Sequence, residues 1–306
     1  MRGPLFGFFS LLLLQLSWFP KAWGQQVPVP LQDVKLQAAV AKGGSTFTYK
    51  YLVVNPAVNV GRIGKIAIDI TRNAQQAQLS SDQLVNGGCY APNISQRTLQ
   101  RVPLIPVGID GPAGWICALA PAGAPSSGGL AGWAAKGQAF LILPDQTNDG
   151  FVLTSPGLPG IRSATIKPAI DYDSLPVEFD DPDKMSALLD SLTFRTSSVG
   201  PTAPPAAPTP LDFLDYLIGL VNDSGNIGWI RVGGVRQSLL AKLDDVRRKV
   251  LAGQPTPATN VLKAFLNEVQ ATSCLGFTCP GNKPLTSEAY ALLFFNGNFL
   301  LSLLAP

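Results

Sequence analysis

Histidine is absent from this chain of 306 residues. Its absence removes the commonest general base and the commonest transition-metal ligand, so Ser-His-Asp or Cys-His catalysis and a His-ligated zinc site are excluded. The nucleophile motif Gly-x-Ser-x-Gly, the P-loop and the dinucleotide fingerprint are also missing. We therefore expect no catalytic residues, no enzymatic activity and no cofactor.

Charge is also scarce. Charged residues make up only 14% of the chain, and 23 basic against 20 acidic side chains leave a net charge of +3. No region has the positive surplus that neutralises many phosphates, so nucleic acid is not expected as a partner. The apolar fraction of 46% is high enough for real hydrophobic cores.

The first residues of the chain have the pattern of an export signal. Arg2 supplies a positive start, Leu5–Leu16 an apolar stretch, and Ala22-Trp23-Gly24 the small residues that signal peptidase reads. This pattern predicts a signal peptide over residues 1–24. The alternative is an anchor that stays in the membrane, but polar residues interrupt the apolar run before it reaches bilayer length. We expect a secreted or cell-envelope protein in an extracytoplasmic compartment.

Four cysteines remain, Cys89, Cys117, Cys274 and Cys279. An even number in an exported chain predicts disulfide bonds. Proximity along the sequence favours the pairs Cys89–Cys117 and Cys274–Cys279. A four-thiolate metal site would need two close Cys-x-x-Cys pairs, which this spacing does not provide.

Residues 25–199 have the period of β-strands. Phe47, Tyr49, Tyr51 and Val53 alternate with other side chains, and turns rich in Gly and Pro punctuate the region. The strands predicted in this way cover residues 47–54, 66–71, 140–143, 151–154, 164–170 and 191–197. No long amphipathic helix separates them, so we expect an antiparallel, immunoglobulin-like β-sandwich rather than a parallel sheet.

Two tryptophans in this region are candidates for ligand stacking. Trp115 and Trp133 are large amphipathic side chains of the kind that stack on sugar rings. The alternative is that they belong to the core of the sandwich, as one or two tryptophans per sandwich usually do.

Acidic residues gather between positions 171 and 183. They are Asp171, Asp173, Glu178, Asp180, Asp181 and Asp183. Loops rich in Asp can supply the six to eight oxygens that calcium requires, although this spacing is not that of an EF-hand. Two prolines in the segment favour an ordinary solvated loop instead. Paired carboxylates could also run glycoside hydrolysis, but acids on an exposed loop do not provide two groups across a cleft.

A proline-rich stretch marks the clearest domain boundary. Residues 200–210 hold five prolines, which predict an extended, semi-rigid linker. Beyond it, over residues 211–306, the apolar period changes to about 3.6. Thr209 and Thr256 each precede a proline and are predicted to cap helices. Four amphipathic helices with short loops predict a small antiparallel four-helix bundle.

The last of these helices is apolar on most sides, and a membrane anchor is the alternative. Its run is short for a bilayer, and Asn296-Gly297-Asn298 places polar groups in its middle. Burial against the three other helices explains it better, so we expect no stable membrane insertion. Two separately packed bodies would then share the chain.

Two segments resemble known proteins. Residues 150–162 (GFVLTSPGLPGIR), together with Gly114-Trp115 and Gly132-Trp133, resemble a sandwich-like module of uncharacterised exported bacterial proteins. That resemblance implies fold and export, without an activity.

The second resemblance lies in the helices. Residues 238–244 (SLLAKLD), 263–269 (KAFLNEV) and 285–293 (LTSEAYALL) resemble the FIMAH domain, a helical module near the C-terminus of exported bacterial proteins. The longer loop with Trp229 and the Asn296-Gly297-Asn298 triplet depart from its pattern. The resemblance implies an accessory or interaction role and assigns no site residues.

Three functions stay open at this point. The leading one is an exported, non-enzymatic binding or surface-interaction protein, with a cell-surface glycan or a protein as possible partner. The second is a structural or matrix protein. The third is a hydrolase that uses carboxylates without histidine.

Overall fold

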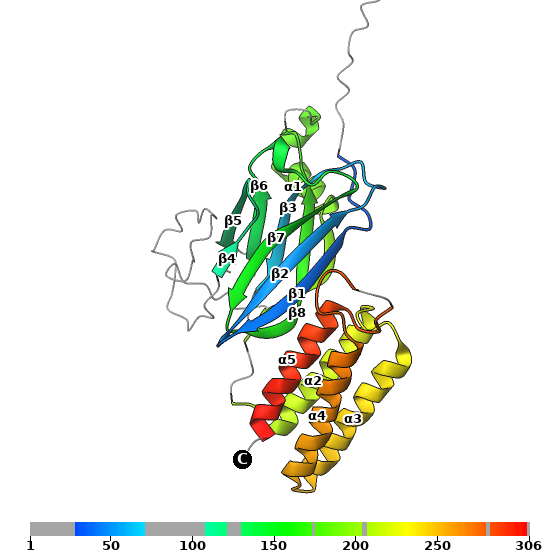
Figure 1. Ribbon diagram of the computed structural model, residues 1–306. Coiled ribbons are helices and arrows are strands. Elements are labelled where there is room, and N and C mark those ends of the chain that lie inside the picture. Colours follow the sequence, from blue (N-terminus) through cyan, green and yellow to red (C-terminus); the bar gives the residue numbers. More distant parts are fainter. Residues whose placement is uncertain are drawn as a thin grey trace, which may run out of the picture.

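The computed structural model describes residues 28–70, 108–120, 130–172, 175–203, 207–279 and 282–304. Within these residues the chain forms two antiparallel sheets followed by helices (Figure 1). The strands are β1 (Lys35–Gly43), β2 (Thr46–Asn55), β3 (Ile63–Asp69), β4 (Gly108–Asp110), β5 (Trp115–Ala120), β6 (Leu130–Ala135), β7 (Gln146–Ser155), β8 (Leu158–Pro168) and β9 (Phe194–Thr202).

The two sheets face each other and bury aromatic side chains between them. One sheet has the order β1-β2-β7-β4 and the other β5-β6-β3-β8-β9. Tyr51 of the first sheet lies 5.8 Å, centroid to centroid, from Trp133 of the second. Phe151 of the first sheet contacts Trp115 of the second, with centroids 4.9 Å apart. The inward positions predicted from the alternation over residues 47–53 are buried, as expected.

Two of the strands predicted for this region need correction, and the prediction is also incomplete. Residues 140–143 do not form a strand: they lie at a 3-10 turn, η2 (Gln138–Phe140), and only Ile142 makes an isolated bridge, to Ile63. The expected strand at 191–197 begins at Phe194, because a helix, α1 (Pro182–Ser191), precedes it. The strands β1, β4, β5 and β6 were not predicted, since their small residues and glycines weaken the period-two pattern.

The strand β9 extends into the predicted linker. Residues 200–202 pair with β8, and Pro201 lies opposite Pro159. Because β9 is an edge strand, the missing N–H of Pro201 can face away from the sheet without breaking the ladder. Its carbonyl oxygen also accepts two hydrogen bonds from Arg162, at 3.0 and 2.7 Å. The sheet therefore ends three residues later than the proposed boundary at 199.

Four helices follow. They are α2 (Pro210–Asn226), α3 (Gly233–Leu251), α4 (Pro255–Thr272) and α5 (Ser287–Leu304). Thr209 caps α2 as predicted, in a capping box with Asp212. The predicted cap at Thr256 is wrong, because α4 already begins at Pro255. The helices pack side by side, with α3 between α2 and α4, and α5 against α2 and α4.

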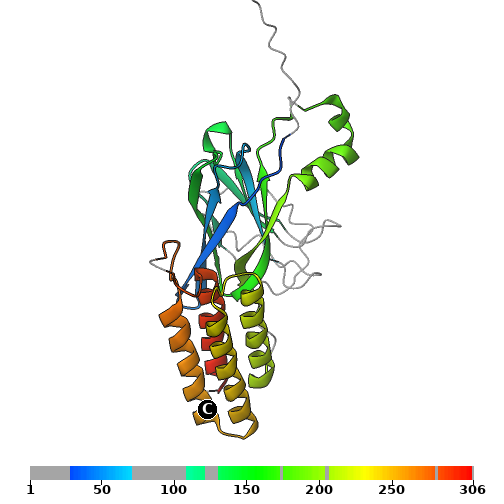
Figure 2. The same cartoon turned by 90° about the vertical axis from the view of Figure 1, so that its right-hand side faces the viewer.

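The helix α5 also packs on the sandwich (Figure 2). Phe295 contacts Phe47 of β2, with ring centroids 5.2 Å apart. A single hydrophobic cluster runs from the strands through the helices. The expectation of two separately packed bodies is therefore wrong: α5 is buried against two helices and the sheets, instead of against three helices.

Two buried polar side chains of α5 bind strand backbone. Glu288 Oε1 accepts a 2.7 Å hydrogen bond from the backbone N–H of Ala38 in the edge strand β1. Asn296 Nδ2 donates to the carbonyl of Pro159 in β8 at 2.8 Å. Edge strands carry unpaired backbone groups that invite aggregation, and a covering helix is one way to protect them. The helix thus closes this edge of the four-stranded sheet.

The polar triplet in the middle of α5 has a packing role. The helix runs without a break through Asn296-Gly297-Asn298. A Cβ at Gly297 would lie only 2.7 Å from Leu266 Cδ2 of α4, so glycine allows the two helices to approach closely. In the described part of the chain, none of the helices is long and apolar enough to cross a membrane.

Candidate functional site

The structure places both candidate stacking residues in the core. Trp115 is 2% exposed and Trp133 is 1% exposed. The indole nitrogen of Trp133 donates to the carbonyl of Asp110 at 2.7 Å, whereas that of Trp115 has no partner among the residues that the structure describes. Neither ring offers a face to a ligand. The glycan-stacking hypothesis is therefore wrong for these two residues, and core packing is the correct alternative.

The described acidic residues between 171 and 183 do not gather into a calcium site. Glu178 and Asp180 lie on a 3-10 turn, η4 (Val177–Asp180). Asp181 caps α1 and accepts hydrogen bonds from the backbone nitrogens of Asp183, at 2.9 Å, and Lys184, at 3.4 Å. Asp173 lies outside the described residues. Over the described ranges, Asp171 included, no group of three or more such ligands gathers around one point.

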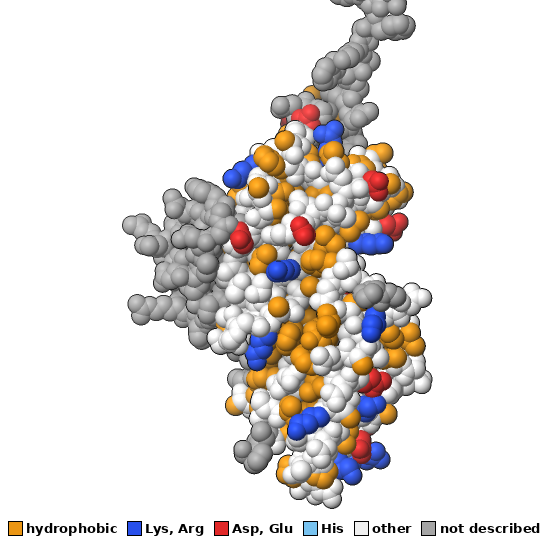
Figure 3. All heavy atoms as spheres, in the orientation of Figure 1, with side chains coloured by type: hydrophobic (Ala, Val, Ile, Leu, Met, Phe, Trp, Pro, Cys, Tyr) orange, Lys and Arg blue, Asp and Glu red, His pale blue; other side chains and the backbone are white. Residues whose placement is uncertain are grey.

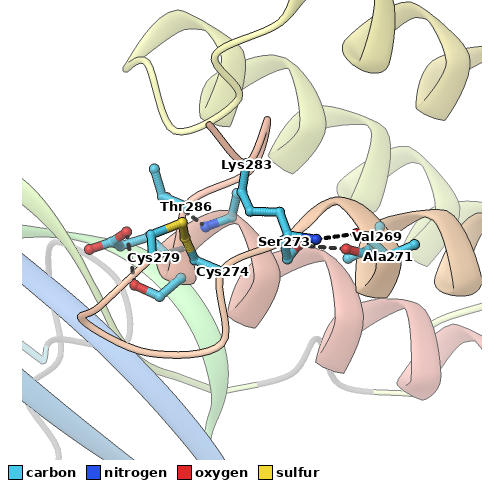
Figure 4. The surroundings of a disulfide bond; sticks show 10 residues. Val269, Ala271, Ser273, Cys274, Cys279, Lys283 and Thr286 are labelled. Atoms are coloured by element: carbon cyan, nitrogen blue, oxygen red, sulfur yellow. Dashed lines mark hydrogen bonds between the residues drawn. A yellow bond between two sulfur atoms is a disulfide. The ribbon is translucent and has the colours of Figure 1, made fainter. Parts of the chain in front are cut away.

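The cysteines have a structural role. Cys274 and Cys279 form the expected disulfide, which closes a short loop after α4 (Figure 4). Lys283 Nζ donates a hydrogen bond to the carbonyl of Ala271 at 2.8 Å. This bond connects the segment after the loop to the end of α4. Cys117 is also disulfide-bonded. Its predicted partner, Cys89, lies outside the described residues.

A different part of the sandwich offers a cavity. Between β8 and β9 the chain leaves the sheet and forms η4 and α1 at the end of the sandwich away from α2–α5 (Figure 1). We call residues 169–172 and 175–193 the excursion. It has a small core of its own, built on Leu175, Leu188 and Leu192. Because this core is separate from the main one, a space is left between the excursion and the five-stranded sheet.

This space is a pocket of about 430 Å³, which we call the apical pocket. Its floor is the outer face of β3, β6 and β8, and its walls come from the excursion and the segment after η2. The residues that line it are Gly64, Lys65, Ala134, Ala135, Gly137, Gln138, Leu141, Lys167, Pro168, Ala169, Ile170, Tyr172 and Leu189. Most of this surface is apolar, as in ligand pockets of this size.

A glycine, Gly64, lies in the floor where space is tight. A Cβ at Gly64 would lie 3.1 Å from the Cα of Ala169 and 3.3 Å from Leu141 Cδ2. The backbone of β3 can therefore approach both walls at once. A larger residue at this position would push the walls apart.

Two lysines lie side by side in the pocket. Lys65 of β3 and Lys167 of β8 are cross-strand partners in the antiparallel ladder. Side chains opposite each other in such a pair are close, and like charges there repel. Burial, together with the charge of Lys65, lowers the pKa of Lys167. Asp190 acts in the opposite direction, but its carboxylate is paired with Arg195.

The described lining of the pocket thus carries positive charge and no acidic side chain. Neither Lys65 nor Lys167 has an ion pair or a side-chain hydrogen bond within the described residues. Two lysines are the charged side chains among the described residues that line the pocket. The remaining polar groups are Gln138, whose Oε1 accepts from Arg62 Nη1 at 3.2 Å, and the exposed Tyr172. This arrangement can hold an anion, but it contains no pair of carboxylates for hydrolysis.

Sequence reasoning missed this pocket. The strands that carry Lys65 and Lys167 were both predicted in part, and each lysine belongs to the outward side of its strand. Their contact depends on the pairing of β3 with β8, which are about a hundred residues apart. The sequence contains one weak signal for the outward position of the two lysines. Each lysine is next to an isoleucine of a predicted strand, Ile66 or Ile166, and both isoleucines are buried.

A second hollow lies where α5 meets the sandwich. It has a volume of about 380 Å³ and lies between the β1–β2 hairpin and α5; we call it the basal hollow. Phe47, Phe294, Phe295 and Phe299 line it, and Lys42 lies over the ring of Phe47, 5.8 Å from its centroid. Figure 3 shows hydrophobic atoms gathered where α5 meets the sheet. Lys42, the cation among the described residues that line the basal hollow, already lies over the ring of Phe47.

The comparisons with known proteins identify no family. No protein-family model matches the chain, and no curated protein matches it. The resemblance to the FIMAH domain therefore stands on the quoted motifs alone. Among solved structures, an uncharacterised protein from Nocardia farcinica, described as having an immunoglobulin-like fold, is 10% identical. The match covers 56% of this chain and 98% of that one, with a TM-score of 0.29, too low to support an argument.

Proposed function

We propose that this chain is an exported, non-enzymatic binding protein whose ligand site is the apical pocket. The observation that carries the proposal is the pocket itself, a largely apolar cavity with two uncompensated lysines on its floor. Concave apolar sites with a few converging polar groups are the usual form of small-molecule sites. The immunoglobulin-like character of the sandwich belongs to this proposal, since sandwiches commonly present binding surfaces at their ends.

The helices have a supporting part in this proposal. As a small four-helix bundle, α2–α5 would close the edge of the four-stranded sheet through Glu288 and leave the opposite end of the sandwich free. This agrees with the accessory role that the FIMAH resemblance implies. The shared core, however, makes the helices an integral part of the fold.

The proposal can be tested with a variant in which a large side chain fills the apical pocket. The substitution Ala134→Phe would place a ring in the space above β6, where Ala134 lines the cavity. Ala39→Phe is the matched control, because Ala39 is partly exposed in β1 of the other sheet. The thermal midpoint of the full secreted chain would be measured against panels of glycans, peptides and small organic ions. Ligands that bind the native state raise the midpoint.

We expect at least one ligand class to stabilise the wild type and Ala39→Phe, and to lose its effect in Ala134→Phe. Ligands that stabilise all three proteins equally would contradict the assignment of the site. Circular dichroism of each variant would establish that the fold is retained.

A further inference from the structure

The two lysines define where a charged group of a ligand would lie. Lys65 and Lys167 point from neighbouring strands toward the same side of the sheet, so their ammonium groups can both reach one acidic group placed between them. The charge of Asp190 also acts on Lys167, but its carboxylate forms an ion pair with Arg195. An anion in this position would relieve the repulsion between the two lysines.

The remaining walls define the other part of the ligand. Leu141, Ile170 and Leu189 line the cavity from three different segments, and Ala134 and Ala135 continue the apolar surface on β6. Burial of an apolar chain there would contribute free energy in proportion to the area removed from water. Tyr172, which is 61% exposed, adds an aromatic ring at the mouth.

We infer that the apical pocket binds an amphipathic organic anion, with its acidic group between Lys65 and Lys167 and its apolar body against Leu141, Ile170 and Leu189. This inference rests on the proposed function and adds the chemical class of the ligand. A neutral glycan does not fit, because it would leave the two charges uncompensated and meet a mainly apolar wall. A carboxylate or a phosphate monoester head supplies the negative charge.

The experiment uses isothermal titration calorimetry on the full secreted chain with three probes of equal chain length: decanoate, decyl phosphate and the uncharged decanol. Acetate and inorganic phosphate test the head groups alone. The variants are Lys65→Ala, Lys167→Ala and the double variant. Lys50→Ala is the matched control, because Lys50 is exposed in β2 of the other sheet. Lys42→Ala tests the basal hollow.

We expect decanoate or decyl phosphate to bind, and the better of the two identifies the head group. Each single lysine variant should weaken binding about tenfold and the double variant about a hundredfold, because each loses one charge-assisted contact. Lys50→Ala and Lys42→Ala should bind like the wild type. Affinity of the wild type should fall as salt rises, which is a test that needs no variant.

Several results would overturn the inference. Decanol binding as tightly as decanoate, equal binding by the double variant, or no binding of any probe would each do so. Loss of binding in Lys42→Ala alone would place the ligand in the basal hollow. If Ala134→Phe blocks some other ligand while the lysine variants change nothing, the binding function stands and the ligand class proposed for it is wrong.

Discussion

The contact between α5 and the edge of the sandwich gives a quantitative prediction. Replacing Glu288 by Ala removes the acceptor of the Ala38 backbone N–H, a bond of 2.7 Å. Both residues are buried, at 5% and 0% exposure, so water cannot replace the lost acceptor without rearrangement. The perturbation therefore acts on the helices and on the sheet at once.

The magnitude follows from three terms. A hydrogen bond to a charged group contributes about 1.5–3 kcal/mol. A carboxylate in the first turn of α5 adds about 0.3–1 kcal/mol through the helix dipole. The cost of burying the carboxylate opposes both, so we expect Glu288→Ala to lower the free energy of unfolding by about 2–3 kcal/mol. Glu288→Gln keeps an oxygen acceptor and should lose only about 1 kcal/mol.

The assay is denaturant unfolding with two probes. In a Trp229→Phe background that lacks residues 1–24, tryptophan fluorescence reports Trp115 and Trp133 in the sandwich, while far-ultraviolet circular dichroism reports mainly the helices. Because one hydrophobic cluster spans both parts, the two transitions should coincide and move together in Glu288→Ala.

A matched control is Asp244→Ala, an exposed acid on α3, which should change stability by less than about 0.5 kcal/mol. The reasoning fails if Glu288→Ala is as stable as this control. It also fails if the helical signal shifts while the tryptophan signal stays, since the sandwich would then fold independently of α5.

Two further predictions concern packing and pH. Gly297→Ala should lower the free energy of unfolding by about 1–2 kcal/mol despite a better helix propensity, because the new Cβ would lie 2.7 Å from a methyl group of α4. Gly219→Ala should raise the free energy of unfolding by about 1 kcal/mol, because nothing packs within 4 Å of a Cβ at that position. Thermal or denaturant unfolding measures both, and equal effects would refute the close approach. Burial raises the pKa of Tyr49 and Tyr51 above the ordinary value of 10.0, so the unfolded chain ionises first as the pH rises. The free energy of unfolding is therefore unaffected by the ionisation of these two phenols below pH 10. Above pH 10 it should fall by about 2.7 kcal/mol per pH unit, because both phenols ionise first in the unfolded chain. Ultraviolet titration should show both phenols ionising only on unfolding, and their ionisation in a folded protein would contradict the prediction.

The sequence alone determined the local structure wherever a periodic pattern was strong. Alternating aromatic residues from Phe47 to Val53 identified β2, and the Thr209–Pro210 signal located the start of α2. The prediction failed where the signal was local but weak. Small residues hid β5 and β6, and the ten-residue helix α1 was not predicted, because prolines and acids dominate the segment at its start.

Only the tertiary structure decided which surfaces meet. The sequence pattern shows that α5 is apolar on nearly all sides. It cannot show whether helices or a sheet cover these sides, because either one buries the same apolar side chains. It likewise cannot show that Trp115 and Trp133 face the opposite sheet. The apical pocket depends on strand pairing between Lys65 and Lys167, a long-range contact that is set by the packing of the whole fold and leaves almost no trace in either segment alone.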